Sequence, residues 1–142
     1  MISVSQGSGD KIASRGQTVF RGMREAFGVP QVGQTARTLG VRPKIDIPVD
    51  SNGLVHPKTG GMSVAPGSPT NLPRHRRPTE FGGTGKDPVW GIAVGNLGPD
   101  LSYTPDASPN PTHGIIEPNR SMSFDEYQDA LQSTARNWVR HD

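Results

Sequence analysis

The most constraining part of this sequence is residues 53–64, GLVHPKTGGMSV, where regular structure is interrupted twice within a few residues. An Asn-Gly pair typical of a tight turn begins the segment, and Gly60 and Gly61 begin a second irregular piece just before Ser63. Glycines permit positive φ angles and let another group come close to the main chain. A simple turn needs one such break, so two breaks favour either a hairpin loop or a segment that binds a ligand.

Glycine and proline are unusually frequent, with 18 Gly and 14 Pro among 142 residues. This content predicts short elements joined by long loops, and a hydrophobic fraction of 31% predicts one modest core. Two Trp, four Phe and a helical pattern near the C-terminus argue against a disordered chain. We therefore expect a flexible lead-in at residues 1–16, which are rich in Ser, Gly and charge, and a single folded domain at residues 17–142.

The order of the expected elements indicates an α+β fold, because strands and helices do not alternate regularly along the chain. Two short helices are expected at residues 23–27 and 31–39, each closed by a glycine. Residues 65–88 consist almost wholly of turn formers and predict a long surface loop. Strands are expected at residues 17–23, 44–50 (an edge strand, because a proline lies inside it), 89–94 and 112–118.

The clearest element of the sequence is a helix near the C-terminus. Ser123 and Glu126 form a capping box of the S-x-x-E type, which marks a helix start. Apolar and aromatic side chains then recur at helical spacing, which predicts an amphipathic helix that runs to the end of the chain and packs on a sheet. These positions are Phe124, Tyr127, Leu131, Thr134 and Trp138.

The charge of the chain is mild, with 15 basic and 13 acidic residues and a net charge of +2. Arginine accounts for 11 of the bases, and this residue binds phosphates and carboxylates through two parallel hydrogen bonds. A basic cluster at residues 74–77, RHRR, has only Phe81 as an aromatic neighbour. This pattern disfavours a nucleic-acid partner without excluding it, and a solvated loop or a clamp for one phosphate group explains the cluster better.

Several chemical classes are disfavoured by the residues present. The chain has no cysteine, and its four histidines are scattered without a nearby pair of carboxylates, so no metal site is expected. Residues 81–87, FGGTGKD, fail the phosphate-loop pattern because Glu80 replaces its first glycine and Asp87 follows Lys86. A serine–histidine–aspartate triad could be drawn from Ser63 and His113, but the nucleophile-elbow motif is absent.

Four side chains stand out as candidates for chemistry: Arg21, Ser63, His113 and Glu117. Arg21 ends a short strand, and Gly22 after it leaves room for a ligand beside the guanidinium. Ser63 follows the glycine pair. His113 and Glu117 lie four residues apart on an expected strand, so their side chains face the same side. Each of the charged candidates also has a plain structural interpretation as a surface or strand-end charge, and both alternatives stay open.

Three segments carry a resemblance to a known family. Residues 19–22, VFRG, end an expected strand with an aromatic residue, an arginine and a small residue. Residues 52–64 are similar to a Gly-Leu-aromatic-x-Pro-x-Thr-Gly-Gly-Thr-Ser-Val stretch, the most specific of the three, with Met62 where that stretch has threonine. Residues 112–118 and the helix after them follow a Thr-His-strand-Pro-helix order. Together they resemble the small type VI secretion effector toxins that have an ADP-ribosyltransferase-like fold.

The resemblance implies NAD as the substrate, bound in a cleft between the first strand and the glycine-pair segment. Arg21 would hold a phosphate or a ribose by charge-assisted hydrogen bonds. Further NAD contacts would come from Gly60, Gly61, Met62 and Ser63.

The resemblance also implies roles in the transfer reaction. Breaking the bond between nicotinamide and ribose gives an oxocarbenium-like centre, which a nearby carboxylate stabilises. We expect Glu117 to be that carboxylate, His113 to orient the substrate and Ser63 to position the nicotinamide ribose.

The same resemblance implies an antibacterial, growth-inhibiting toxin that acts on an intracellular target and is silenced by a dedicated immunity protein, its antitoxin. No apolar run reaches membrane-spanning length and no signal peptide is recognisable. We therefore expect a protein that is cytoplasmic in the producing cell and is delivered into the cytoplasm of a target cell, with no membrane partner. The alternative is a non-catalytic toxin or binding module of the same fold, which engages a cellular partner through its cleft or through residues 74–77.

Overall fold

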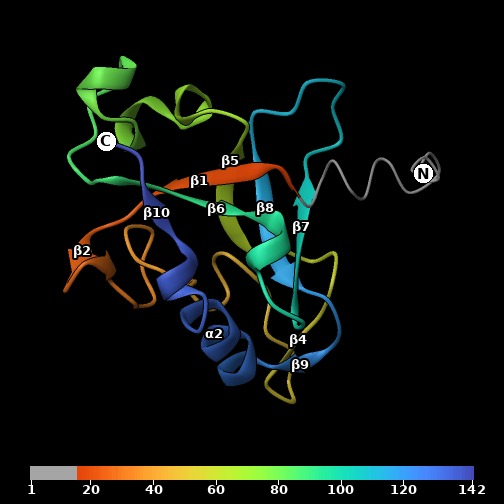
Figure 1. Ribbon diagram of the computed structural model, residues 1–142. Coiled ribbons are helices and arrows are strands. Elements are labelled where there is room, and N and C mark those ends of the chain that lie inside the picture. Colours follow the sequence, from red (N-terminus) through yellow and green to blue (C-terminus); the bar gives the residue numbers. More distant parts are fainter. Residues whose placement is uncertain (1–15) are drawn as a thin grey trace, which may run out of the picture.

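The computed structural model describes residues 16–142 and is organised around a six-stranded antiparallel sheet (Figure 1). The strand order is β10-β6-β1-β5-β8-β7, so the three segments that carry the family resemblance include the adjacent strands β1, β5 and β8. The strands of this sheet are β1 (Thr18–Gly22), β5 (Met62–Pro66), β6 (Val89–Ala93), β7 (Leu101–Pro105), β8 (Gly114–Pro118) and β10 (Val139–Arg140).

Smaller elements surround the sheet. Two short antiparallel pairs are formed by β2 (Glu25–Ala26) with β3 (Val29–Pro30), and by β4 (Leu54–Val55) with β9 (Met122–Ser123). The α-helix is α2 (Phe124–Gln132), and five 3₁₀ turns are η1 (Pro69–Asn71), η2 (Arg74–Arg76), η3 (Thr79–Phe81), η4 (Val94–Asn96) and η5 (Ala135–Asn137). The described chain is therefore α+β, as predicted, with small antiparallel sheets and one helix near the C-terminus.

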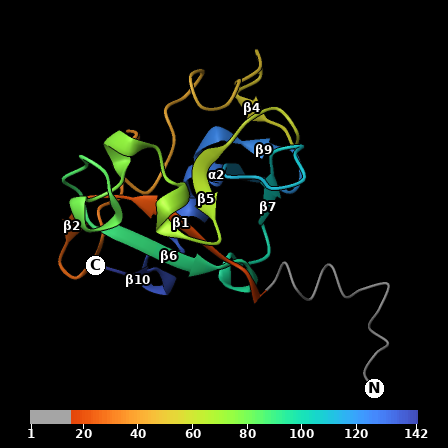
Figure 2. The same cartoon turned by 90° about the horizontal axis from the view of Figure 1, so that it is seen from above.

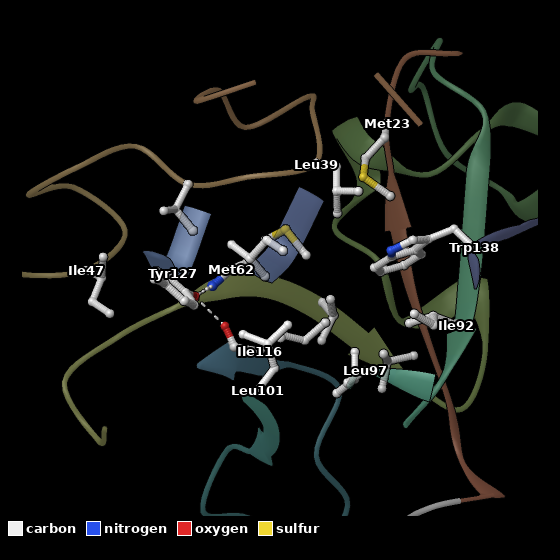
Figure 3. Packing of buried hydrophobic residues seen from close by; sticks show 14 of the residues in the cluster. Met23, Leu39, Ile47, Met62, Ile92, Leu97, Leu101, Ile116, Tyr127 and Trp138 are labelled. Atoms are coloured by element: carbon white, nitrogen blue, oxygen red, sulfur yellow. Dashed lines mark hydrogen bonds between the residues drawn. The ribbon is translucent and has the colours of Figure 1, made fainter. Parts of the chain in front are cut away.

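The two faces of the central sheet are covered differently. Successive side chains of a strand point to opposite faces, and Val19 of β1 packs in one apolar cluster whereas Phe20 packs in the other. The larger cluster lies between the sheet and α2, and Figure 3 shows its side chains. The smaller cluster contains Phe20, Ala65, Leu72 and Val89 and lies toward the η1–η3 turns, which Figures 1 and 2 show on the other side of β1 from α2.

Helix α2 is fixed to the sheet by one buried tyrosine and one buried glutamine. The Tyr127 hydroxyl donates to the Ile116 carbonyl of β8 at 2.5 Å and accepts from the Met62 amide of β5 at 3.2 Å (Figure 3). Gln128 accepts from the Val41 amide at 3.1 Å and donates to the Gly33 carbonyl at 3.0 Å. The helix therefore holds β5, β8 and the 33–41 loop in fixed relative positions.

Several sequence predictions are confirmed. Strands predicted at residues 17–23, 89–94 and 112–118 are β1, β6 and β8, and the capping box of Ser123 and Glu126 is formed in both directions. A lead-in was predicted at residues 1–16, and all but the last of these residues lie outside the described part of the chain. The division into lead-in and domain therefore stays a prediction.

The helix predicted at residues 23–27 is wrong, because this segment begins the β2–β3 hairpin. Phe27 and Gly28 at its tip have φ angles of 57° and 85°, and two consecutive positive φ angles are characteristic of a type I′ hairpin turn. Met23 is completely buried in the larger cluster. A sharp reversal therefore starts directly after β1, where a helix would have carried Met23 away from the core.

The helix predicted at 31–39 and the edge strand predicted at 44–50 are also wrong, since both segments are loops. Each segment folds back on itself through main-chain hydrogen bonds. The Leu39 amide donates to the Gln31 carbonyl at 2.8 Å, and the Asp46 amide donates to the Arg42 carbonyl at 2.9 Å. Lys44 has a φ angle of 69°, which breaks an extended strand. Contacts with distant residues also override the local propensities: Arg21 donates to the Thr38 carbonyl at 2.9 Å, and the Gly61 amide donates to the Asp46 carbonyl at 3.0 Å.

The last helix is shorter than predicted. α2 ends at Gln132, and residues 139–140 form β10, an edge strand paired with β6. Trp138 is buried and donates from its indole to the Thr134 hydroxyl at 2.9 Å. The two residues keep their spacing of four, but both lie beyond the end of α2, at the two ends of η5, because the chain turns back to the sheet.

The surface loop predicted at residues 65–88 begins only after β5 and is organised as the turns η1, η2 and η3. Leu72 from this loop is buried in the smaller cluster, with Phe81 packed against it. The loop is therefore anchored to the sheet, and its basic residues have defined positions.

Candidate functional site

A cavity of about 430 Å³ lies where β1 and β5 meet the surrounding loops. Its lining includes Arg21, Ser63 and His113, three of the four residues predicted to carry out chemistry. Four further charged or titratable residues line the cavity, namely Arg42, Asp46, His75 and Arg76. The sequence did not indicate Arg42 or Asp46 as site residues. His75 and Arg76 come from the predicted surface loop at residues 65–88. The fold thus brings together side chains that are far apart in the sequence.

Arg21 lies at the base of the cavity with an exposed fraction of 7%. Within the described chain its guanidinium donates only to main-chain carbonyls: to Thr38 from Nε at 3.2 Å and Nη2 at 2.9 Å, and to Ser63 from Nη1 at 2.9 Å. Longer bonds from Nη2 reach the carbonyls of Thr35 at 3.3 Å and Gly40 at 3.4 Å. Because Nη1 carries two hydrogens, one of them has no acceptor among residues 16–142.

The charge of Arg21 lacks a direct counter-ion, because no carboxylate of the described chain forms an ion pair with it. Burial lowers the pKa of Arg21 to about 10, and the negative charge of Asp46 opposes this shift. The group therefore stays charged at neutral pH. A buried cation that meets only dipoles is costly, and it favours an anion placed in the adjoining cavity.

Gly22 serves a different purpose from the one that the sequence suggested. A Cβ atom at this position would lie 2.9 Å from the Arg76 carbonyl oxygen. The glycine thus admits the η2 turn against β1. This close approach places the Arg76 side chain at the cavity.

Ser63 and His113 both reach the cavity. Ser63 is on β5 opposite Ile115 of β8; its side chain is exposed, and its hydroxyl makes no hydrogen bond within residues 16–142. His113 precedes β8, and its Nδ1 lies 3.0 Å from the Asp106 carboxylate. The triad drawn from the sequence is not formed, because no hydrogen bond joins the two within the described chain.

The glycine pair does not line the cavity. A Cβ at Gly60 would lie 2.5 Å from the Asp46 carbonyl oxygen, and one at Gly61 would lie 2.5 Å from the Ile116 carbonyl oxygen. Met62 is completely buried in the larger cluster. The three residues predicted to contact NAD beside Ser63 therefore pack the end of β5 against a loop, β8 and the core.

Glu117, the predicted catalytic carboxylate, is also outside the cavity lining. It has an exposed fraction of 4%, accepts from the Lys58 amide at 2.5 Å and accepts from the Thr104 hydroxyl. Lys58 has a φ angle of 65°, which is uncommon for a residue with a side chain. The carboxylate thus ties the 56–59 turn to β7 and β8, and the structure does not bring it to Arg21, Ser63 and His113.

Asp46 is the carboxylate that the structure places in the cavity lining. Arg42 binds it from the backbone amide at 2.7 Å, from Nε at 3.2 Å and from Nη2 at 2.9 Å. Partial burial raises the pKa of Asp46, but the bonds from Arg42 outweigh this effect and hold the pKa below its usual value. The group is therefore ionised at neutral pH. Its only signal in the sequence is the basic–acidic spacing of four residues.

The glycine-rich stretch at residues 81–87 is a packed loop. The amides of Thr84 and Gly85 donate to the carbonyls of Arg74 and Arg77 at 2.9 and 2.8 Å. A Cβ at Gly83 would lie 2.0 Å from the Arg77 carbonyl oxygen. Because these amides are already used, the loop offers no cradle for a phosphate, in agreement with its failure to match the phosphate-loop pattern.

Residues 16–142 lack two further classes of feature, a metal cluster and a membrane-spanning helix. No cluster of three or more histidine or acidic side chains there has the arrangement that a metal ion requires. In the same residues we find no helix with the length and apolar character needed to cross a bilayer.

Comparison with known proteins identifies one family. A model of the Tse2 ADP-ribosyltransferase toxin family matches residues 17–142, which is nearly the whole described chain. No significant match was found among curated proteins or among solved structures. The match includes β1, β5 and β8, which hold the cavity residues Arg21 and Ser63. The chain belongs to the Tse2 ADP-ribosyltransferase toxin family.

Proposed function

We propose that the protein is an NAD-dependent ADP-ribosyltransferase whose substrate binds in the cavity above Arg21, and that this activity makes it a growth-inhibiting toxin. Membership of an ADP-ribosyltransferase toxin family supports the reaction class. The observation that carries the location is the buried Arg21 guanidinium, which among residues 16–142 has carbonyl partners only and adjoins the cavity.

The cavity residues fit the chemistry of NAD. Its volume of about 430 Å³ lies within the range of roughly 300–1,000 Å³ typical of ligand sites. Three arginines and one aspartate line it, so the balance of fixed charge is positive. A pyrophosphate is doubly negative and suits such a lining, because arginine is well matched to phosphate oxygens. Arg21, Arg42 and Arg76 would hold it.

The remaining roles fall to two polar side chains. The Ser63 hydroxyl has no partner within residues 16–142 and would bond a ribose hydroxyl. His113, oriented by Asp106, would bond the substrate at the cavity edge. NAD, when bound, supplies an ADP-ribose group with nicotinamide as its leaving group. The residues of the chain bind, orient and electrostatically stabilise that group.

The biological setting that we propose follows the family. The toxin acts in the cytoplasm of a target cell that receives it by type VI secretion, and a dedicated immunity protein protects the producer. An intracellular macromolecule accepts the ADP-ribose. The net positive cavity and its exposed basic edge give a neutralising protein an obvious site to block.

A second function is favoured by one observation. Arg74 and His75 of η2 are exposed, and Arg74 forms no ion pair within the described chain. A non-catalytic toxin would use this basic turn to engage an acidic surface of a cellular partner. Arg74→Gln would then abolish growth arrest and leave nicotinamide release unchanged. The matched control is Arg136→Gln, because Arg136 is also an exposed arginine, and this variant should still arrest growth.

Ser63→Ala tests the proposed function with little risk to folding, because the side chain is exposed and unbonded within the described chain. Ser51→Ala is its control, since Ser51 is exposed and also makes no side-chain hydrogen bond there. We expect growth arrest and nicotinamide release by wild-type and Ser51→Ala protein and a loss of both in Ser63→Ala. Release at the wild-type rate by Ser63→Ala would place the reaction elsewhere.

A further inference from the structure

The reaction that we propose needs negative charge near the ribose, and the structure changes which residue can provide it. Positive charge develops on the ribose as its bond to nicotinamide breaks, and a carboxylate held close to it lowers the barrier. Glu117 is enclosed by the 56–59 turn and β7. Among residues 16–142, Asp46 supplies the single carboxylate of the cavity lining.

Asp46 is held firmly in place by its neighbours. Its main-chain carbonyl accepts from the Gly61 amide at 3.0 Å, and the absence of a side chain at Gly60 permits this approach. The glycine pair of the sequence therefore has an indirect role in the site. It attaches the Asp46 turn to the end of β5, the same strand that presents Ser63.

The carboxylate still has capacity for a substrate. Oδ2 accepts from the amide and Nε of Arg42, whereas Oδ1 accepts, among the described residues, only from Nη2 of Arg42. Each carboxylate oxygen has about two lone-pair directions, so Oδ1 retains one. The side chain of Asp46 is 15% exposed, and the residue is part of the cavity lining.

The charges around Asp46 keep its carboxylate anionic. Arg42 on its own loop and Arg21 on β1 both favour the ionised form. Arg76, His75 and His113 line the same cavity. A fixed anion among cations also prevents a purely cationic site, which would bind the pyrophosphate well but would repel the positive charge of the reacting ribose.

We propose that Asp46 is the carboxylate that stabilises the positive charge on the ribose during ADP-ribosyl transfer, with Arg42 as the positioning residue that fixes its orientation. This inference rests on the proposed function. In the transfer, the bond between C1′ and the nicotinamide nitrogen breaks and its electron pair leaves with nicotinamide. The nucleophilic atom of the acceptor, or water, bonds to C1′ and releases its proton to the solvent. Asp46 stays ionised throughout and forms no covalent bond.

The test compares two carboxylate variants in the full chain. Nicotinamide release, NAD affinity by calorimetry and the midpoint of thermal unfolding are measured for wild-type, Asp46→Asn and Glu117→Gln protein. We expect Asp46→Asn to lower kcat about 100-fold with NAD affinity unchanged or tighter, because a negative charge beside the pyrophosphate has gone. Glu117→Gln is expected to unfold at a lower temperature and to keep its kcat.

Wild-type kcat in Asp46→Asn, or a loss confined to Glu117→Gln, would overturn the assignment while leaving the proposed function intact. If wild-type protein neither binds NAD nor releases nicotinamide, the proposed function fails and the assignment fails with it.

A second variant keeps the assignment testable if Asp46→Asn does not fold. Arg42→Gln keeps the Asp46 carboxyl group and the bond from the backbone amide of residue 42, but it removes the cation that fixes the orientation of the carboxylate and favours its ionised form. We expect the acid limb of the kcat–pH profile to move to higher pH, since none of the other titratable residues of the lining, Arg21, Arg76, His75 and His113, bonds to Asp46 within residues 16–142. An unmoved acid limb in folded Arg42→Gln protein would overturn the role of Asp46.

Discussion

Arg21 and Glu117 are both charged, both more than nine-tenths buried and both candidates from the sequence, yet the structure uses them in opposite ways. Glu117 is enclosed and receives a backbone amide and a hydroxyl. Within residues 16–142, Arg21 donates only to carbonyl oxygens, and it adjoins a cavity. Burial of a charge therefore does not indicate a site by itself. A buried charge indicates a site when it lacks a counter-ion and borders a space that a ligand can fill.

The largest effect in this comparison is expected from Arg21→Ala. The substitution leaves the carbonyls of Thr38 and Ser63 without their donor in a buried region, and we expect the free energy of unfolding to fall by about 3–5 kcal/mol. Urea unfolding followed by circular dichroism measures it. Arg21→Lys restores the charge but not the planar fork and should recover only part of the loss. A loss below about 1 kcal/mol in Arg21→Ala would show that these bonds contribute little.

The next effect is stabilisation by an anion. Pyrophosphate or NAD at 100 times its dissociation constant should raise the free energy of unfolding by about 2.7 kcal/mol, because it binds only the folded state. We expect wild-type and Glu117→Gln protein to be stabilised equally, since Glu117 lies outside the cavity. Thermal unfolding at increasing ligand concentration measures the effect. A smaller shift in Glu117→Gln would bring that residue back to the site.

A smaller effect is expected from Glu117→Gln itself. The amide oxygen can still accept from Lys58, but the charge that strengthens both bonds is lost, so we expect a destabilisation of about 1–2 kcal/mol. Hydrogen exchange should report faster opening of the 56–59 turn than of β1. Uniform destabilisation, with no local change at Lys58, would contradict the role of Glu117 in holding this turn.

The smallest effect concerns acid stability. Arg37 bonds hold the pKa of Asp87 below its usual value, and Arg42 bonds do the same for Asp46. A carboxyl whose pKa is lower in the folded state stabilises the fold above its unfolded pKa of about 3.9, and this contribution is lost as pH falls through the folded value. Asp87→Asn should therefore reduce the steepness of stability against pH below about pH 4. An unchanged slope would contradict the shift.

Local patterns predicted the parts of the fold whose structure depends on neighbours in sequence. The β-branched content of β1, β6 and β8 and the capping box at Ser123 were sufficient to identify those elements. The 31–47 loops were predicted wrongly because their shape depends on the Arg21 guanidinium, on Gln128 and on the Gly61 amide. Each of these partners lies far away in sequence.

The candidate site was predictable in part for the same reason. Arg21, Ser63 and His113 could be named because each lies in a segment with a recognisable pattern, and the structure brings all three to one cavity. Asp46 could not, since it lies in a turn whose place in the molecule is set by the glycine pair that precedes β5. Glu117 was predicted as the catalytic carboxylate because strand alternation places its side chain on the same face of the strand as His113. Only the structure shows that the 56–59 turn covers Glu117 on that strand.

Calorimetric titration of NAD into the full-length protein tests most directly whether the cavity above Arg21 is a dinucleotide site. We predict saturable binding of one NAD per chain, weakened by competing pyrophosphate, weakened by Ser63→Ala and unchanged in Ser51→Ala. The absence of saturable binding, or binding that neither pyrophosphate nor Ser63→Ala weakens, would contradict the placement of NAD in this cavity.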